Sequence, residues 1–586
     1  MFELPRSSWD DYDKLLLSEG GGVYPRTLKS VPLTPQVAHA LGLPQDTGAL
    51  TPQELMRAVL RAPVDLLWNG GIGTYVKSVP ESSSDAGDKA NDSIRINGAD
   101  LRVRVVGEGG NLGFTQLGRI EASRAGVLIN TDAIDNSAGV DTSDHEVNIK
   151  ILLDSVVRSG DLTQKQRNKL LAQMTDDVAA HVLDHNYEQN VLLSNARAQS
   201  HSMLPVHKRF VRWLEERGEL DRTLEFLPSD AEIDRLDALG GGLSSPEFSV
   251  LVAYSKMVLA DDLLDSQLPD EPYYQRVLES YFPSEISSQY SDRLASHPLR
   301  REIITTVVVN QIINRGGITF VFRTMEETGA TPVEIARAHT VVREVFGLDD
   351  FWSRVAELDN RVPVRAQSGL YLESRRLLDR ASRWLLQSRR SLLEVEAEIE
   401  HFSQVKGLIT EIPQMLRGAE RERLLSRVAE YTAQGVPDEL ALVTAAHLDA
   451  FSLLDIVELA NGTGQEADDV GFVYFALSDR FEVDKMLNRI TELPRDERWH
   501  ALARMALRYD LYSALAGLTS NVLTLTPEGG SPEERITDWE NANAEGLARA
   551  RTTLHEIASS DSFDLATLSV ALRVVRTLVS AAGSRA

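Results

Sequence analysis

The sequence predicts an α/β region over residues 1–155, followed by a large all-α region over residues 156–586 that has room for two subdomains. Three observations lead to this division. A chain of 586 residues is too long for one hydrophobic core. Up to about residue 150, glycine turns separate short β-branched runs and short helices. Beyond that point, apolar residues recur at helical spacing.

The first strong local signals lie between residues 51 and 74. Thr51-Pro52-Gln53-Glu54 is a capping box with proline at the first helical position, so a helix is expected to begin at Pro52 and to end before Pro63. Residues 64–68 (VDLLW) then predict a buried strand, because a short apolar run bounded by turn residues is typical of one. The segment 69–74 follows directly, and its glycines allow close approach of the backbone to a neighbour.

Residues 103–146 are the most informative segment. The β-branched run Val103–Val106 is expected to form a strand, and a glycine turn at 107–113 (GEGGNLG) and a helix follow it. A second apolar run at 127–130 predicts another strand. Strand, glycine turn, helix and strand is the order that places a nucleotide at the carboxyl edge of a parallel sheet. We therefore expect part of a Rossmann-like dinucleotide-binding domain here.

Three turns rich in glycine or asparagine each follow a predicted strand, at residues 69–74, 107–113 and 135–140. Successive strand ends of a parallel sheet line one crevice, so the three turns are expected to converge. The third turn lies in a predicted polar loop that carries Asn136, Gly139 and Ser143. Asn111, Asn136 and Ser143 are either hydrogen-bonding contacts to a ligand or residues that only shape turns. Asp132 is either an acid that binds a ribose or a loop residue.

Helical patterns dominate the rest of the chain. Apolar residues of 299–315 form one stripe, and a capping box at Thr331 opens a helix that is expected to end near Gly347. Residues 372–408, dense in arginine and glutamate, predict one long helix or two in series. The segment 526–533 (TPEGGSPE) is expected to interrupt the last helical stretch before a helical tail.

Composition narrows the partners and the compartment. The net charge of -26 disfavours nucleic acid or an anionic membrane as a partner, because like charges repel. The absence of cysteine excludes disulfides and thiolate metal sites, and it fits a reducing cytoplasm. No apolar run reaches the roughly 18 residues of a membrane-spanning helix, and the N-terminus lacks a secretory pattern. We expect a soluble, cytoplasmic chain.

Two clusters of basic residues are assigned no chemistry. His181 and His185 are four residues apart on a predicted helix, but the sequence shows no acidic third ligand nearby. A satisfied or solvated pair is therefore favoured over a metal site, and no metal is predicted. Six arginines alternate with acidic and apolar residues between positions 375 and 390. They predict a helix face in ion pairs, with nucleic-acid binding as the weaker alternative.

Four segments resemble the large bacterial NAD-dependent glutamate dehydrogenases, namely RSSWDDYDKLLLSEGGGVYPRTLKSVPL, RAPVDLLWNGGIGTYVK, VVGEGGNLGFTQLGRIE and INTDAIDNSAGVDTSDHEVNIKILL. The similarity is dense over residues 5–155, and the helical remainder resembles the C-terminal region of that family. Residues 108–111 match the family's E-G-A-N turn, and residues 136–146 match its N-A-G-G-V-x-x-S-x-x-E segment. Ser137 and Ala138 depart from that segment, and the larger side chain in place of glycine is expected to tighten the pocket.

The resemblance implies an enzyme that uses NAD to oxidise L-glutamate to 2-oxoglutarate and ammonium. By position, Asn111 and Asn136 would lie beside the nicotinamide and its ribose, Thr74 near that ribose, and Ser143 at the side-chain carboxylate of glutamate. The predicted cofactor-binding residues are Gly70, Gly71, Thr74, Gly110, Asn111 and Asn136, and the predicted substrate-binding residue is Ser143.

Two parts of such an enzyme are not recognised in the sequence. No segment resembles the family's lysine-glycine-glycine catalytic turn, and the first glycine-rich phosphate loop is absent. We therefore predict no catalytic residue in this chain and expect the isolated chain to be inactive. It would be the C-terminal portion of a homo-oligomeric enzyme, as a fragment, a truncated gene or one part of a split protein, and would need the upstream region of the same enzyme. The alternative is a catalytically incomplete helical scaffold for oligomerisation or effector sensing.

Overall fold

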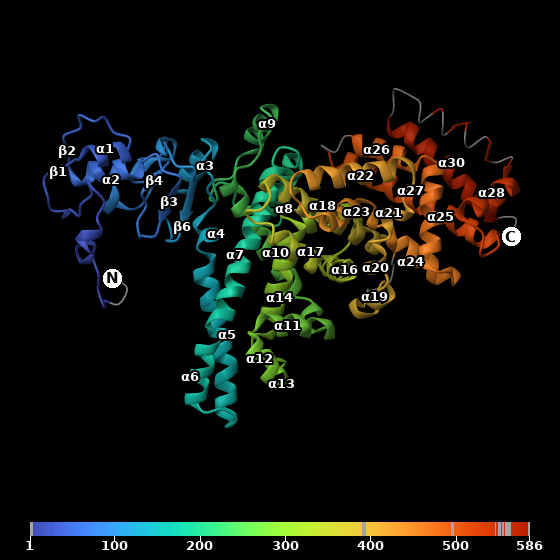
Figure 1. The fold of residues 1–586 in the computed structure, drawn as a ribbon, viewed down its shortest axis with the longest axis horizontal. Helices are drawn as coiled ribbons and strands as arrows, with labels where there is room; N and C mark the ends of the chain where they lie inside the picture. The colour runs from blue at the N-terminus through green and yellow to red at the C-terminus, as the bar shows by residue number, and fades with distance from the viewer. Residues whose placement is uncertain are drawn as a thin grey trace. The chain divides into compact units, whose positions relative to one another are not determined.

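The computed structural model describes residues 4–388, 394–493, 497–544, 547–548, 552–553, 556 and 564–583. Within these residues helices dominate, and all named strands lie between residues 31 and 108 (Figure 1). The chain forms two compact units. Unit 1 comprises Met1–Leu204, Val211–Met257 and Glu279–Arg300, and unit 2 comprises Pro205–Phe210, Val258–Leu278 and Arg301–Ala586. The predicted boundary at residue 155 falls inside helix α5, Ser137–Ser159, and as a domain boundary it stays a prediction.

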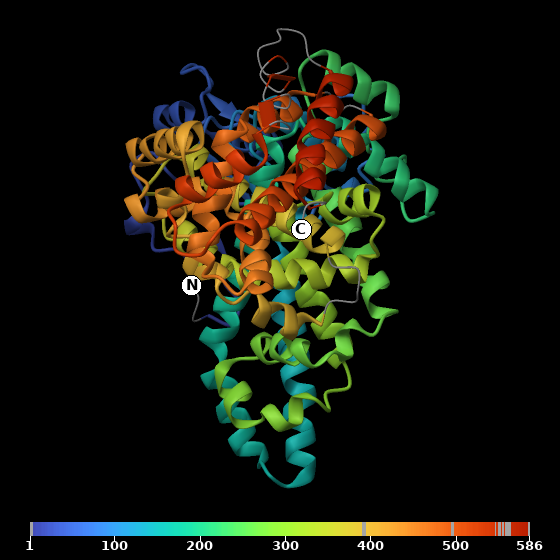
Figure 2. The same ribbon diagram turned by 90° about the vertical axis from the view of Figure 1, so that its right-hand side faces the viewer.

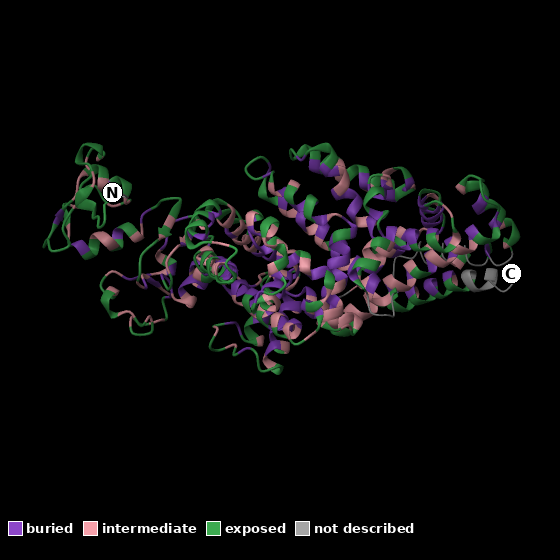
Figure 3. Cartoon of the chain, turned by 90° about the horizontal axis from the view of Figure 1, so that it is seen from below, coloured by how far each residue is buried: buried purple, intermediate pink, exposed green. Residues whose placement is uncertain are grey.

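Residues 4–100 form short elements that are exposed over most of their surface (Figure 3). In chain order they are η1 (Trp9–Asp11), η2 (Lys14–Leu16), β1 (Val31–Pro32), α1 (Pro35–Ala40), β2 (Ala49–Leu50), α2 (Pro52–Leu60), β3 (Leu66–Asn69), β4 (Val76–Lys77), η3 (Lys89–Asn91), β5 (Ile96–Asn97) and η4 (Gly98–Asp100). Helix α2 confirms the prediction at both ends. Thr51 and Glu54 bond each other's backbone amides in a capping box, and the helix stops before Pro63.

A parallel strand pair positions the candidate site. Strand β3 pairs with β6, Val105–Glu108, and Asn69 lies opposite Glu108, so both strands end at the same edge. Helix α3, Gln116–Arg124, follows β6 as predicted. The predicted strand at 127–130 makes one parallel bridge, from Leu128 to Val105. Buried side chains beneath this pair form a small core of Val76, Ile96, Leu101, Val103, Val106, Phe114, Ala122, Val127 and Ile129.

Residues 64–68 are predicted to form a buried strand. A strand is present as β3, but the prediction that it is buried is wrong. Leu66 and Trp68 are 54% and 61% exposed, whereas Leu67 packs against the small core. Successive residues of a strand point to opposite faces. One face of β3 is therefore covered by the core, and the other stays open to solvent within the described residues.

The predicted polar loop around residues 136–143 is also wrong, because this segment is helical. Helix α4, Asp132–Asp135, is followed directly by α5, whose first residue is Ser137. The first two turns of α5 are mostly exposed, and its buried residues begin at His145. The start of the helix therefore shows no apolar periodicity, and its glycine and serines resemble turn residues.

Helix α5 packs along α7, Thr175–Ala198, and the two lie side by side in both ribbon views (Figures 1 and 2). The other helices of this unit are α6 (Gln164–Gln173), α9 (Asp230–Ala238), α12 (Ser284–Gln289) and α13 (Ser291–Leu294). Four helices contain residues of both units, namely α8 (Leu204–Glu216), α10 (Ser245–Leu264), α11 (Gln275–Tyr281) and α14 (Arg300–Gln311).

Unit 2 is helical throughout its described residues. Before α14 it contains η5 (Leu268–Asp270) and η6 (Pro272–Tyr274). The later elements are α14 (Arg300–Gln311), the π-helix η7 (Ile312–Gly316), α15 (Phe320–Thr328), α16 (Pro332–Val345), α17 (Leu348–Ala356), α18 (Val364–Ser388), α19 (Val395–His401), α20 (Val405–Leu408), α21 (Ile412–Met415), α22 (Gly418–Ala433), α23 (Asp438–Ala450), α24 (Leu453–Thr463), α25 (Ala467–Arg480), α26 (Val483–Glu492), α27 (Arg498–Leu525), α28 (Pro532–Ala542) and α30 (Leu565–Gly583).

Most helix predictions in this region are confirmed. The stripe at 299–315 becomes α14 and η7, the capping box at Thr331 opens α16, and the break at 526–533 separates α27 from α28. Of the two alternatives for residues 372–408, helices in series fit the described residues, because Glu394 is not helical and separates α18 from α19.

The predicted ion-paired arginine face is confirmed for part of α18. Arg376 pairs with Glu373 at 2.9 Å, and Arg383 pairs with Asp379 at 3.2 Å. Arg389 and Arg390 lie outside the described residues. No single described helix is long and apolar enough to cross a membrane. Only α23 and α24 together meet the criterion of length and composition, and they bend by 66° at their junction.

Candidate functional site

The first two predicted glycine turns meet at the carboxyl edge of β3 and β6. The backbone amide of Gly110 donates to the carbonyl oxygen of Asn69 at 3.0 Å, and the hydroxyl of Thr74 donates to the carbonyl oxygen of Leu112 at 2.8 Å. These bonds link the end of β3 to the turn that follows β6. The predicted residues brought together here are Gly70, Gly71, Thr74, Gly110 and Asn111.

Gly110 is required by the close contact between the two turns. A Cβ atom added at this position would lie 2.7 Å from the carbonyl oxygen of Gly71. A backbone oxygen cannot rotate away as a flexible side chain can, so any other residue would push the turns apart. Thr74 is only 7% exposed. Its side chain therefore joins the turns and does not project into solvent.

The third predicted segment also reaches this edge, although it is a helix junction. The side-chain amide of Asn136 donates to Asn111 Oδ1 at 2.7 Å. Asn136 occupies the N-cap position of α5, yet its side chain makes no capping bond. The contact with Asn111 takes the place of that bond. Two residues predicted to flank one ring of a ligand thus lie in direct contact.

Ser143 lies on the same helix, farther from this contact. It follows Asn136 by seven residues, which is about two helical turns or roughly 10.5 Å along the axis. The side chain is exposed, and its hydroxyl donates to the carbonyl oxygen of Val140 at 2.7 Å. Ser143 is therefore on the face of α5 that also carries Asn136, but it does not touch the glycine turns.

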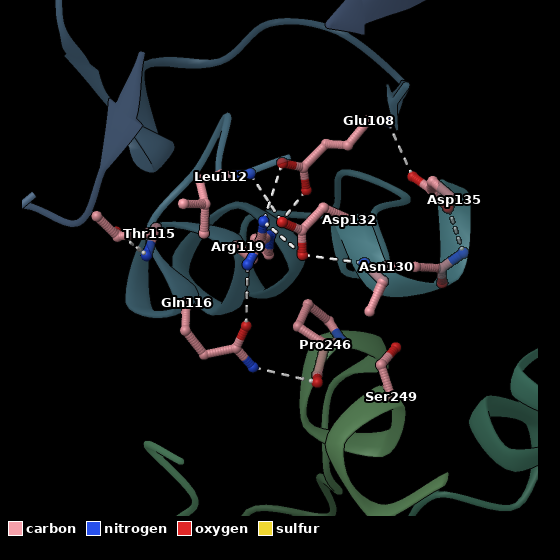
Figure 4. A network of polar contacts seen from close by, with 12 residues as sticks. Glu108, Leu112, Thr115, Gln116, Arg119, Asn130, Asp132, Asp135, Pro246 and Ser249 are labelled. Carbon is pink, nitrogen blue, oxygen red and sulfur yellow. Dashed lines mark hydrogen bonds and ion pairs between the residues drawn. The ribbon is translucent and has the colours of Figure 1, made fainter. Parts of the chain in front are cut away.

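A buried charge network supports the turn at residues 107–113 (Figure 4). Glu108 is 0% exposed and Arg119, on α3, is 5% exposed. Arg119 Nε donates to Glu108 Oε2 at 2.7 Å, and Arg119 Nη2 donates to Glu108 Oε1 at 3.0 Å. The same guanidinium lies 3.1 Å from Asp132 Oδ1. A two-point ion pair of this kind fixes the strand end relative to α3.

Asp132 connects this network to the backbone of the turn. Its Oδ2 accepts the amide of Leu112 at 2.7 Å. Leu112 has φ of 60°, a conformation that costs energy for a residue with a Cβ and that the surrounding bonds must hold. Both oxygens of Asp132 bond groups of the protein, which favours a structural role over ribose binding, although the residue begins helix α4 and does not lie in a loop.

Burial shapes the ionisation of two acids in this network. It raises the pKa of the Glu108 carboxyl, and the charge and hydrogen bonds of Arg119 oppose that rise. It also raises the pKa of Asp135, which accepts the backbone amide of Glu108 at 3.0 Å and the side-chain amide of Asn130 at 3.2 Å. Glu108 and Arg119 are thus buried beneath the turn, whereas Asn111 within the turn is exposed.

Sequence reasoning missed three residues of the site. Asn69 ends β3, and its Nδ2 is buried without a hydrogen-bond partner among the described residues. Glu108 and Arg119 form the support described above. A polar residue directly after a strand was the available signal for Asn69. For Glu108 and Arg119 no local signal existed, because an ion pair across 11 residues follows no helical or strand period.

Two family models match successive parts of the chain. One family model, described as bacterial NAD-glutamate dehydrogenase, catalytic domain, matches residues 1–196, and another, described as glutamate dehydrogenase, C-terminal, matches residues 240–577. The chain is similar to the NAD-specific glutamate dehydrogenases of Mycobacterium tuberculosis (46% identity over 100% of this chain), Pseudomonas aeruginosa (44% over 99%) and Halomonas elongata (42% over 98%). It spans only 35 to 36% of the length of these relatives.

Proposed function

The chain belongs to the bacterial NAD-glutamate dehydrogenase family, and from this we propose that it forms part of an enzyme that converts L-glutamate, NAD and water into 2-oxoglutarate, ammonium and reduced NAD. The observation that supports the proposal most is the contact between Asn111 and Asn136 at the joined strand ends. It unites two motifs that are 25 residues apart in sequence.

We infer that β3, β6, α3 and the segment 127–130 are the C-terminal part of a Rossmann-like dinucleotide-binding domain that extends to about residue 155. The parallel pairing of β3 with β6 and the parallel bridge at Leu128 support this inference. So does the position of α3 between β6 and the next strand segment, because such crossovers are typical of this fold.

The residues at this edge fit the nicotinamide end of NAD. Asn69 Nδ2 is a buried donor without a partner among the described residues, and the amide of Asn111 is exposed beside it in the second turn. Gly70, Gly71 and Gly110 keep the backbone open to close approach. Thr74 would act by holding the two turns together. When bound, NAD accepts a hydride from the α-carbon of the substrate.

We propose that the start of α5 orients the substrate. Ser143 would turn its hydroxyl hydrogen from Val140 toward the side-chain carboxylate of glutamate. The same helix would then position cofactor through Asn136 and substrate through Ser143, which sets the distance between the reacting carbon atoms.

Oxidation of an amine also needs groups that take protons from the substrate nitrogen and from water. We assign these to the part of the family's proteins that this chain does not span, and we expect the complete enzyme to be a homo-oligomer. In this scheme the described chain binds and orients, and it excludes water beneath the turn.

A substitution on α5 tests the substrate role. Ser143→Ala, in an enzyme that combines this chain with the remaining part of its family's sequence, is expected to raise the KM for glutamate by about 10-fold or more. A hydrogen bond to a charged group contributes about 1.5 to 3 kcal/mol, and 1.4 kcal/mol corresponds to tenfold. The KM for NAD should stay the same.

Ser155→Ala is the matched control, because Ser155 lies on the same helix and its hydroxyl makes the same bond to the carbonyl oxygen three residues before it, at 2.6 Å. Equal losses for glutamate and NAD in Ser143→Ala would contradict the assigned role.

The alternative of a non-catalytic helical scaffold has a direct test. Calorimetric titration of the chain with NAD should show saturable heat if the edge of β3 and β6 binds the nicotinamide end. Asn69→Ala should weaken that binding, since it removes a donor that has no hydrogen-bond partner among the described residues. The absence of any binding, in a chain that folds, would favour the scaffold.

A further inference from the structure

Two imidazoles and one carboxylate gather between α5 and α7, away from the glycine turns. Asp141 and His145 are four residues apart on α5 and share one face, and His185 faces them from α7. One ligand atom from each of the three residues lies within 4.8 Å of the others. All three belong to unit 1. The sequence singled out His185 only as a pair with His181, for which no metal is predicted, because Asp141 and His145 lie 44 and 40 residues earlier in the chain.

His145 is the unusual member of the group. Its side chain is 0% exposed, and neither ring nitrogen has a hydrogen-bond partner among the described residues. Nε2 lies 3.7 Å from Asp141 Oδ1, too far for a hydrogen bond. The ring stacks on Tyr281 with centroids 4.2 Å apart. A buried polar group without a partner costs about 1 to 3 kcal/mol, so the native state gains if something binds this nitrogen.

The two histidines differ in how readily they give up a proton. At His185, burial is outweighed by the hydrogen bond with Asp141, which raises the pKa of the ring, so a metal would have to displace a proton there. His145 has no such bond. Burial lowers its pKa to about 4, so at neutral pH the imidazole is uncharged and a ring nitrogen has a free lone pair. A neutral imidazole is the form that binds metal ions. The carboxylates of Asp141, Asp144 and Glu188 lie near the two histidines and contribute negative charge. One ammonium group, that of Lys256, contributes positive charge there. The surrounding charge is therefore negative.

We propose that Asp141, His145 and His185 bind a divalent transition-metal ion of the zinc type. Zinc sites combine histidine nitrogens and carboxylate oxygens, whereas calcium and magnesium take oxygen ligands. With metal–ligand bonds of about 2.0 to 2.2 Å, tetrahedral geometry places two ligand atoms roughly 3.3 Å apart. The observed 3.7 Å between His145 Nε2 and Asp141 Oδ1 is close to that separation.

The arrangement leaves one coordination position for water or for His181. His181 precedes His185 by one helical turn, and its ring centroid lies 5.8 Å from that of His145. At present His185 Nδ1 bonds Asp141 Oδ2 at 2.7 Å. Metal binding through His185 Nδ1 would replace this hydrogen bond with two metal–ligand bonds, one from Nδ1 and one from Asp141, and would release the shared proton to solvent.

A metal at this site would affect the position of Ser143, the proposed substrate contact, but it would take no part in the oxidation of glutamate. Ser143 lies between Asp141 and His145 in sequence and points outward from the same helix. An ion held by both α5 and α7 would fix the helix that carries Ser143 and Asn136. The metal is therefore assigned a structural role, and its binding can be measured without glutamate or NAD.

Metal content gives the primary test. The 586-residue chain, prepared without a histidine tag and stripped with a chelator, is dialysed against low-micromolar Zn²⁺ and analysed by elemental mass spectrometry. We expect about one equivalent of zinc per chain. His145→Gln, Asp141→Asn and His185→Gln should each weaken the binding by about 10-fold or more. Co²⁺ in place of Zn²⁺ should give visible absorption bands that these variants lose.

His201→Gln is the matched control. His201 Nδ1 lies 3.7 Å from Asp237 Oδ1, the same separation as at the proposed site, but both side chains are more than half exposed and no third ligand joins them. This variant should keep the full equivalent of zinc. Zinc should also raise the unfolding temperature of the parent chain and of His201→Gln only, because a ligand of the folded state stabilises it.

The outcomes that overturn the proposal are specific. One is a parent chain that binds well under half an equivalent. Another is a His145→Gln variant that binds as much zinc as the parent. A third is equal loss in His201→Gln, which would indicate surface binding only. If His145→Gln fails to fold by circular dichroism, Asp141→Asn and His185→Gln decide, since both side chains are partly exposed and tolerate change. Each result leaves the dehydrogenase proposal unaffected.

Discussion

Glu108 and Arg119 form a charged pair directly beneath the glycine turn of the candidate site. Neither side chain projects toward a ligand, because both are buried. Their effect passes through Asp132, which bonds Arg119 on one oxygen and the amide of Leu112 on the other. The conformation of the turn thus depends on positioning residues that lie one layer below the surface.

Arg119→Met is expected to destabilise unit 1 by about 3 to 5 kcal/mol. The substitution leaves the Glu108 carboxylate buried and unpaired, and breaking a buried ion pair from one side costs about this amount. Urea denaturation followed by circular dichroism measures it. Arg104→Met serves as the control, because the pair of Arg104 with Asp65 is 3.6 Å apart and more than four-fifths exposed.

The double variant Glu108→Gln with Arg119→Met separates charge from packing. It removes the unpaired charge, so it should recover most of the loss. A double variant as unstable as Arg119→Met alone would show that the shape of the guanidinium matters and its charge does not.

Gly110→Ala should disturb binding and stability together. The added Cβ would lie 2.7 Å from the carbonyl oxygen of Gly71, and the two turns must separate to relieve the contact. Overpacking of this kind costs about 1 to 3 kcal/mol. We expect a lower unfolding midpoint and at least about 10-fold weaker NAD binding by calorimetry. Gly48→Ala, with no atom within 4 Å of the added Cβ, should change neither.

At the level of elements, α2 and α5 show what could be predicted and why. Helix α2 was predicted at both ends because its capping residues, Thr51 and Glu54, and its stop at Pro63 are local in sequence. The start of helix α5 is predicted as a loop because its first two turns are mostly exposed and carry no apolar stripe. The residues named within it, Asn136 and Ser143, came from a resemblance and not from the helical pattern.

The contacts between side chains of different elements could not be predicted from the sequence, for a different reason. Arg119 meets Glu108 across 11 residues, and His185 meets Asp141 across 44. Such pairs depend on how α3 and α7 pack, which no periodicity within one element encodes. Short apolar runs and the glycine turns that follow them, by contrast, are local signals, and they indicated the segments that form the edge of β3 and β6.

The π-helix η7 in unit 2 is followed by a single glycine, and replacing this glycine tests whether it stabilises the π-helix. Gly317 follows it with φ of 99°, and an added Cβ would lie 1.4 Å from Arg375 Nη2. Gly317→Ala combines an unfavourable φ with a clash against a guanidinium. We expect a loss of about 2 to 3 kcal/mol in unfolding free energy, measured by chemical denaturation.

Gly462→Ala, in the same unit, is expected to raise the free energy of unfolding instead of lowering it. Gly462 lies inside α24, and an added Cβ there meets no atom within 4 Å. Alanine is favoured over glycine in a helix by up to about 1 kcal/mol. If Gly317→Ala proved as harmless as Gly462→Ala, the glycine would not be what holds η7.

On the scale of the whole molecule, the seven predicted site residues all fall in unit 1, whereas unit 2 is helical throughout its described residues and carries buried acids of its own. The net charge of -26 spreads over both units. Lowering the pH reduces this charge and thus the self-repulsion of the folded chain. The titration of a buried acid in unit 2 adds a further contribution to the pH dependence of the folded chain's stability.

Asp455 should make stability fall as pH rises through neutrality. It is buried on α24, accepts Trp384 Nε1 at 2.8 Å, and burial raises its pKa to about 7. Between its ordinary pKa of about 3.9 and pH 7, the folded state holds a proton that the unfolded state has lost. The stabilising contribution is therefore complete below about pH 4, declines as pH rises, and is absent above pH 7.

Unfolding by urea at pH 5, 6, 7 and 8 measures this slope. Because one pKa unit corresponds to about 1.4 kcal/mol, Asp455 accounts for a decline on the order of 2 to 4 kcal/mol. Asp455→Asn cannot ionise, so it should flatten the profile and exceed the parent in stability at pH 8. The exposed Asp468, changed to Asn, should leave the slope intact. Added salt screens the net charge but not a buried carboxyl, so a slope that salt abolished would assign the dependence to surface repulsion instead of Asp455.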